Sequence, residues 1–176
     1  SEISKRGIID VLRNQVTDRG IYLDLCYFQP KSDLNPDLQK LYLLNKFTLV
    51  RQLHYSTENE NSIDIVLFLN GLPILTMELK NKATGQNYKH AEYQYKNDRD
   101  PNEPFLRFKR CMVHFCVDKH NVSMTTRLSG RKTFFLPYNR DIENPPVDIG
   151  YSTKYLWEEI LHPDSILDII ENFVHL

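Results

Sequence analysis

Three charged residues interrupt two otherwise apolar stretches of this sequence. Asp64 stands inside the run 63–69, whereas Glu78 and Lys80 lie at the end of the run that begins at Pro73. Isolated charges are expensive inside a buried strand unless they are paired or bind a metal. Two carboxylates can supply the hard oxygen ligands that Mg²⁺ prefers. The residue types therefore predict a metal-assisted site.

The chemistry that such a site would support is hydrolysis. We expect Mg²⁺, with Mn²⁺ as a possible substitute, to be held by Asp64, Glu78 and the backbone carbonyl of Leu79. A bound metal lowers the pKa of its water and polarises a phosphodiester oxygen. Lys80 would hold that water or stabilise developing negative charge. A bare Glu-x-Lys is common, however, and more often forms surface salt bridges; its setting within apolar strands makes this one more specific.

Whether Asp64 and Glu78 share a face depends on the loop between their strands. The Asn-Gly at 70–71 between apolar runs predicts a hairpin. A two-residue loop would pair Asp64 with Met77 and place Glu78 on the opposite face, because side chains alternate along a strand. We therefore predict either a three-residue loop, which pairs Asp64 with Thr76, or a bulge that restores the parity.

The other segments supply the frame for this hairpin. Their order is typical of an α/β or α+β domain, with a mixed central sheet flanked by helices. Apolar periodicity and turn residues define the elements. We expect helices at 3–19, 36–44, 87–98, 153–161 and 163–175, and strands at 47–55, 63–69, 73–79, 111–117, 122–128 and 134–136.

The composition narrows the functional class. A chain of 176 residues suits one compact domain. Its three cysteines form no Cys-x-x-Cys pair, which favours a reducing compartment, hence the cytoplasm, and disfavours zinc. No apolar run approaches the roughly 20 residues that span a bilayer, so no membrane is expected.

Positive charge is concentrated in one part of the sequence. The net charge of the chain is −1, but residues 80–110 hold eight Lys or Arg and four Asp or Glu. A solvated surface is the ordinary explanation of such a stretch. Because it directly follows the Glu-x-Lys motif, we expect it to form a rim that contacts DNA phosphates.

The sequence resembles a known nuclease family. Asp64 followed by Glu78-Leu79-Lys80 matches the PD-(D/E)XK nuclease pattern. The wider likeness is to the N-terminal nuclease region of type I restriction endonuclease R subunits, and it covers most of the chain. It rests on the segments 45–52 (NKFTLVRQ), 62–73 (SIDIVLFLNGLP), 78–81 (ELKN), 91–95 (AEYQY), 113–115 (VHF) and 134–139 (FFLPYN).

The resemblance implies an activity and further site residues. It implies endonucleolytic hydrolysis of double-stranded DNA, with a PD-(D/E)XK restriction-endonuclease-like core. Members often carry Gln-x-x-x-Tyr on the helix after the Glu-x-Lys strand, where Gln94 would position DNA or the nucleophile. Position 98 is Asp rather than Tyr, and Tyr95 is the nearest aromatic residue, so this part of the site departs from the family pattern.

The resemblance also implies partners. Residues 1–176 would be a single nuclease domain, excised from a longer chain with a C-terminal helicase or translocase motor. The expected partners are double-stranded DNA, that motor, and the methylation and specificity subunits. The sequence has no Gly-x-x-x-x-Gly-Lys-Ser/Thr loop, so we expect this domain not to bind ATP by that route.

Two alternative functions remain open. The domain could be a non-catalytic DNA-binding or docking module whose carboxylates are structural. It could also be a stand-alone nuclease that acts on branched or damaged DNA. The intact Asp64, Glu78 and Lys80 argue against the first alternative, and dependence on a motor would separate the second from the main hypothesis.

Overall fold

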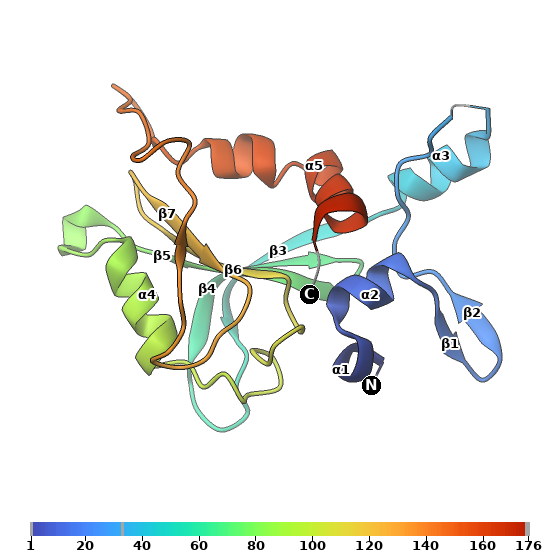
Figure 1. Cartoon of the computed structure of the whole chain (residues 1–176), viewed down its shortest axis with the longest axis horizontal. Helices are drawn as coiled ribbons and strands as arrows, with labels where there is room; N and C mark the ends of the chain where they lie inside the picture. Colours follow the sequence, from blue (N-terminus) through green and yellow to red (C-terminus); the bar gives the residue numbers. More distant parts are fainter. Residues whose placement is uncertain (1, 33, 175–176) are drawn as a thin grey trace.

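A six-stranded sheet runs through the middle of the molecule (Figure 1). The computed structural model describes residues 2–32 and 34–174. Strand order is β3-β4-β5-β6-β7-β8; the β5–β6 pair is parallel and the other neighbouring pairs are antiparallel. The predicted α/β class with a mixed central sheet is thus confirmed. The strands are β3 (Phe47–His54), β4 (Ser62–Leu69), β5 (Leu72–Leu79), β6 (Val113–Val117), β7 (Val122–Thr125) and β8 (Leu136–Pro137).

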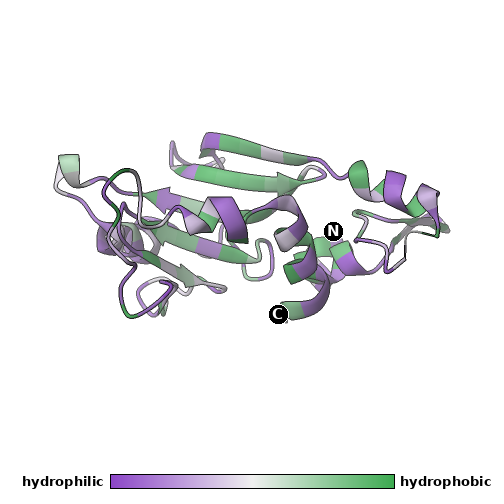
Figure 2. Ribbon diagram, turned by 90° about the horizontal axis from the view of Figure 1, so that it is seen from above, coloured by the Kyte–Doolittle hydropathy of each residue, from purple (hydrophilic) through white to green (hydrophobic). Residues whose placement is uncertain are grey.

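Helices cover both faces of the sheet. On one face α4 contributes Ala91 and Tyr95 to a small apolar cluster with Cys116 of β6. On the other face α2 and α5 join the larger cluster, which includes Leu75 and Phe115 of the sheet. Apolar residues alternate between these two clusters along the strands, and Figure 2 shows the strands as mostly hydrophobic ribbons.

A tight turn joins β4 to β5. Leu69 pairs with Leu72, so the loop contains only Asn70 and Gly71. Their φ angles are 50° and 83°, as a type I′ hairpin turn requires, and Asn-Gly is the favoured pair for it. The predicted three-residue loop is therefore wrong.

A bulge in the same hairpin restores the shared face. The register shifts between residues 67 and 68, which inserts one extra residue into β5. As a result Thr76 pairs with Val66 rather than with Asp64. Continued towards the start of β4, this register places Asp64 opposite Glu78. The bulge that the sequence predicted as the alternative is confirmed.

The N-terminal segment does not form the single helix predicted for 3–19. Gly7 adopts a φ of 89° and separates α1 (Glu2–Arg6) from α2 (Ile8–Arg13). A Cβ at Gly7 would lie 2.9 Å from the Cβ of Lys109, so the chain passes too closely there for a side chain. The next residues form a small hairpin of β1 (Val16–Asp18) and β2 (Ile21–Leu23), which the sequence analysis missed.

The other helices follow the predictions more closely. The predicted helix at 36–44 is α3 (Pro36–Leu43), and that at 87–98 is α4 (Tyr88–Asn97) with Asn87 as its N-cap. A short 3-10 turn, η1 (Lys82–Thr84), precedes α4. None of the helices in the described ranges is long and apolar enough to cross a membrane.

The C-terminal helices are shorter and more irregular than predicted. The π-helical turn η2 (Leu156–Ile160) replaces most of the helix expected at 153–161. The helix expected at 163–175 is divided into α5 (Pro163–Asp168) and the π-helical η3 (Ile169–Phe173). Its predicted end, His175, lies outside the described residues.

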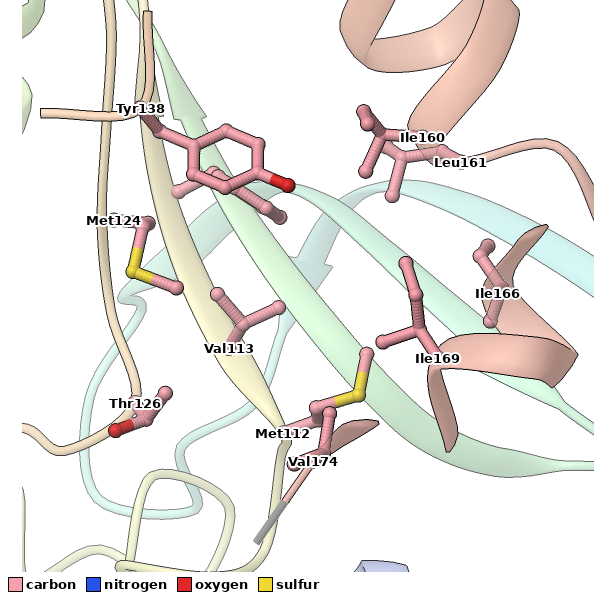
Figure 3. Close-up of a pocket in the computed structure, with 11 residues that line it drawn as sticks. Met112, Val113, Met124, Thr126, Tyr138, Ile160, Leu161, Ile166, Ile169 and Val174 are labelled. Carbon is pink, nitrogen blue, oxygen red and sulfur yellow. The ribbon is translucent and has the colours of Figure 1, made fainter. Parts of the chain in front are cut away.

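An apolar hollow separates these helices from the sheet. Its volume is about 90 Å³, and Figure 3 shows side chains of the sheet, such as Met124 and Val113, facing Ile160 and Ile169 across it. Among the residues that the structure describes, no Asp, Glu, Lys, Arg or His lines it. It belongs to the packing of the larger core, on the face opposite α4, and not to a site of hydrolytic chemistry.

Candidate active site

Glu78 is a carboxylate at the centre of the sheet. It lies near the end of β5, between Met77 and Leu79, and its side chain is 0% exposed. The neighbouring strand places Cys116 beside it in the parallel β5–β6 register. A fully buried carboxylate must be paired, protonated or bound to a cation.

The two carboxylate oxygens of Glu78 have different environments. Oε1 accepts hydrogen bonds from Arg99 Nη2 at 2.8 Å and Nε at 3.1 Å. Oε2 is buried and accepts no hydrogen bond from the residues that the structure describes. Burial raises the pKa of Glu78 to about 7; Arg99 opposes this increase, whereas the nearby Asp64 adds to it. Oε2 is thus a desolvated oxygen that is left to be satisfied by a proton or a cation.

Asp64 approaches Glu78 from β4. Its Oδ2 accepts from the backbone N–H of Leu79 at 2.8 Å, and its Oδ1 accepts from Gln52 Nε2 at 2.7 Å. Gln52 is itself fixed, because its Oε1 accepts from the hydroxyl of Ser62 at 3.0 Å. Gln52 was not predicted as a site residue; its only signal in the sequence is its position on the strand beside Asp64.

Lys80 and Gln94 form a second pair. Lys80 Nζ donates to Gln94 Oε1 at 2.7 Å, and Lys80 N donates to the carbonyl of Val117 at 2.9 Å. The side chain of Gln94 comes from α4, whose start is fixed by a capping box at Asn87. The structure thus brings together two predicted site residues, Lys80 directly after β5 and Gln94 on α4.

The residues around the expected tyrosine position have structural roles. Asp98 is the C-cap of α4, and its N–H donates to the carbonyl of Gln94 at 2.8 Å. Tyr95 is fully buried and its hydroxyl lies 2.7 Å from Thr76 Oγ1. The same Oγ1 lies 2.7 Å from Nδ1 of His114, whose pKa burial lowers to about 4. Tyr95 therefore supports the sheet behind the site instead of replacing the missing tyrosine.

Arg99 is the main residue that sequence reasoning misplaced. It was grouped with the basic rim, yet it is 6% exposed and bonds both Glu78 and the carbonyl of Ser62, the latter at 2.7 Å. The rim prediction is therefore wrong for Arg99. The side chain of Lys82, also in that stretch, lies outside the described residues. The signal for Arg99 was indirect, because a buried Glu78 needs a cation.

The donor set fits a hard divalent cation. Asp64 and Glu78 share one face of the hairpin, and the Leu79 carbonyl follows directly. Within 2–32 and 34–174, no three His, Cys, Asp or Glu side chains gather as a metal-binding group. A cation here would thus rely on two carboxylates, a backbone oxygen and water, as Mg²⁺ sites commonly do. The unpartnered Glu78 Oε2 is the observation that supports the fit.

Comparisons with known proteins place these residues in a family. The family model described as "Type I restriction enzyme R protein N terminus" matches residues 19–133, which is more than half of the chain. A second match is 31% identical over 81 residues to acireductone dioxygenase 2 from Physcomitrium patens. It covers 40% of this chain and 42% of that protein, so the chain spans less than half of that protein's length.

Proposed function

Because the chain belongs to the family of type I restriction enzyme R protein N termini, we propose that it hydrolyses phosphodiester bonds of double-stranded DNA with Mg²⁺. Membership suggests the nuclease domain of an R subunit, and the mixed sheet is consistent with a PD-(D/E)XK-like fold. The observation that carries the catalytic proposal is the unpartnered Oε2 of buried Glu78 on the face shared with Asp64. Mn²⁺ is the expected substitute cation.

The side chains divide the work of the proposed site. Asp64, Glu78 and the Leu79 carbonyl would hold the cation, which supplies an activated water and polarises the phosphate. Arg99 fixes Glu78 through Oε1 and leaves Oε2 free to act as a ligand once it loses its proton. Hydrogen bonds from Leu79 N–H and Gln52 fix the Asp64 carboxylate before any ligand arrives.

Lys80 and Gln94 would act on the reacting phosphate. Gln94 Oε1 accepts from Lys80 Nζ, which orients the ammonium group while two of its protons stay available as donors. An ammonium group in this position stabilises negative charge that develops on a phosphorus-bound oxygen. We therefore assign Lys80 to charge stabilisation and Gln94 to its positioning.

Partners follow from the same proposal. A type I R-subunit domain implies DNA and other subunits in general. We propose that a helicase motor in the rest of the R subunit, together with methylation and specificity subunits, delivers DNA to this domain in the cytoplasm. This domain would not bind ATP.

A plasmid-nicking assay tests the proposal. The parent chain, Lys80→Met and Lys132→Met are incubated with supercoiled plasmid and either Mn²⁺ or Mg²⁺. Lys132 is an exposed lysine outside the site and serves as the matched control. We expect the parent and Lys132→Met to nick the plasmid at similar rates. The nicking rate of Lys80→Met should be about 100-fold lower, within the range for removal of one charge-stabilising donor. Equal nicking by all three would refute the role of Lys80, and nicking by none would favour the docking module.

A further inference from the structure

A hollow of about 380 Å³ opens at the carboxyl ends of the parallel strands β5 and β6. Leu79 and Val117, the last residues of these strands, form part of its lining. Lys80 also lines it while donating to Gln94. The hollow therefore borders the candidate active site and shares Leu79 and Lys80 with it. Its volume is within the roughly 300–1,000 Å³ that is usual for small-ligand pockets.

Two exposed aromatic side chains form another part of this lining. Tyr151 and Trp157 are 53% and 47% exposed, and their rings meet edge to face with centroids 5.8 Å apart. Ser152 N–H donates to the carbonyl of Lys119 at 3.0 Å, which ties this segment to the loop that follows β6. Both aromatic residues lie outside the residues 19–133 that match the family model.

The charge around the hollow favours an anion. Lys80 and the exposed Lys119 both line it. The carboxylate of Asp118, the acidic residue of the lining, accepts three backbone N–H groups, at 2.7, 2.8 and 3.0 Å. Its hydrogen-bonding capacity is thus largely used by its own loop and by the start of α4, whereas the two ammonium groups keep donors for a ligand.

We propose that this hollow binds one unpaired nucleotide of the DNA strand next to the phosphate being cut. The base would stack on the Tyr151–Trp157 pair, as bases do on aromatic platforms, and its phosphate would contact Lys119. The proposal rests on the proposed function, because Lys80 joins the hollow to the reacting centre. It adds a preference for locally unpaired DNA that the two carboxylates alone do not provide.

Trp157 gives a direct probe, because it is the chain's one tryptophan. A short oligothymidylate is titrated into the chain in EDTA, where no cleavage occurs, and tryptophan fluorescence is followed. We expect the single strand to quench the tryptophan fluorescence and a matching duplex to quench it less. Tyr151→Ala and Lys119→Glu should each weaken binding about tenfold, as loss of one stacking or one phosphate contact does.

Matched controls make the test specific. Tyr93 on α4 is 63% exposed and lies outside the hollow, so Tyr93→Ala should bind like the parent. Lys31→Glu makes the same charge change at an exposed lysine away from the hollow. Circular dichroism verifies that each variant is folded. No quenching, or equal losses in variants and controls, would overturn the proposal.

The same experiment separates this proposal from the nuclease proposal. Quenching without any plasmid nicking would support the nucleotide pocket and remove the catalytic assignment. Nicking by the parent without quenching would keep the nuclease and overturn the pocket. Fluorescence that depends on protein concentration in the absence of DNA would instead assign the hollow to a second copy of the chain, which also overturns the proposal.

Discussion

Glu78→Gln should change how the stability of the metal-free protein depends on pH. Glutamine keeps the size of the side chain but cannot ionise. Glu78 is fully buried, and burial raises its pKa to about 7 from the usual value of 4.5. Between these two pH values the folded chain holds a proton that the unfolded chain has lost. Stability must therefore fall as the pH rises through this window.

The magnitude follows from the two pKa values. Each unit of difference between the folded and unfolded pKa corresponds to about 1.4 kcal/mol of unfolding free energy. Ionisation of Glu78 therefore costs the folded chain about 3 kcal/mol in total. The contribution is fully present below about pH 4.5 and is lost above about pH 7. Because Glu78 is 0% exposed, solvent screening reduces this value little.

Urea unfolding from pH 4.5 to pH 8 in EDTA measures this effect. The quantity of interest is the free energy of unfolding of the parent minus that of Glu78→Gln at each pH. Titrating groups that do not interact with Glu78 cancel in this difference, and the altered contact with Arg99 adds a nearly constant offset. We expect the difference to fall by about 3 kcal/mol across the window. A difference that stays flat would refute the argument that burial raises the pKa of Glu78.

Three further substitutions test the frame of the site. Arg99→Met leaves ionised Glu78 without its buried partner, so it should lower the free energy of unfolding by about 3 kcal/mol at pH 8. An equally large loss at pH 5, where Glu78 is protonated, would contradict this explanation. Gly71→Ala places a side chain at a φ of 83° and should cost about 1 kcal/mol in urea unfolding, although its Cβ would meet no atom of the described residues within 4 Å; no loss would contradict the turn assignment. Asn87→Ala removes the N-cap of α4 and should cost about 1 kcal/mol, measured in the same way, whereas a neutral result would show that the cap does not stabilise the helix that carries Gln94.

The strands and the local motif were predictable from the sequence. Apolar runs bounded by turn residues located β3, β4 and β5 to within a residue or so. Asp64 and Glu78 were recognised as candidate site residues because each is a charged residue within such an apolar run. The parity of the strands also showed that a tight Asn-Gly turn needs a compensating bulge, although the sequence did not choose between the bulge and a longer loop.

The predictions that failed concern contacts between segments that are distant in the sequence. Gly7 divides the first helix because Lys109 lies against it, and no local pattern near Gly7 records that contact. Arg99 pairs with Glu78 across 21 positions, and its place in a basic stretch suggested a surface role instead. The Tyr151–Trp157 pair approaches the site only through the fold. Local periodicity carries no information on such contacts.

Calorimetric titration of Mn²⁺ tests the central claim most directly, because it needs neither DNA nor partner subunits. It compares the parent, Asp64→Asn and the control Asp148→Asn, which removes one negative charge at an exposed aspartate elsewhere. We predict that the parent and Asp148→Asn bind the metal equally and that Asp64→Asn binds at least about tenfold more weakly, because it loses one of two carboxylate ligands. Equal binding by all three, or no binding by the parent, would contradict the two-carboxylate metal site.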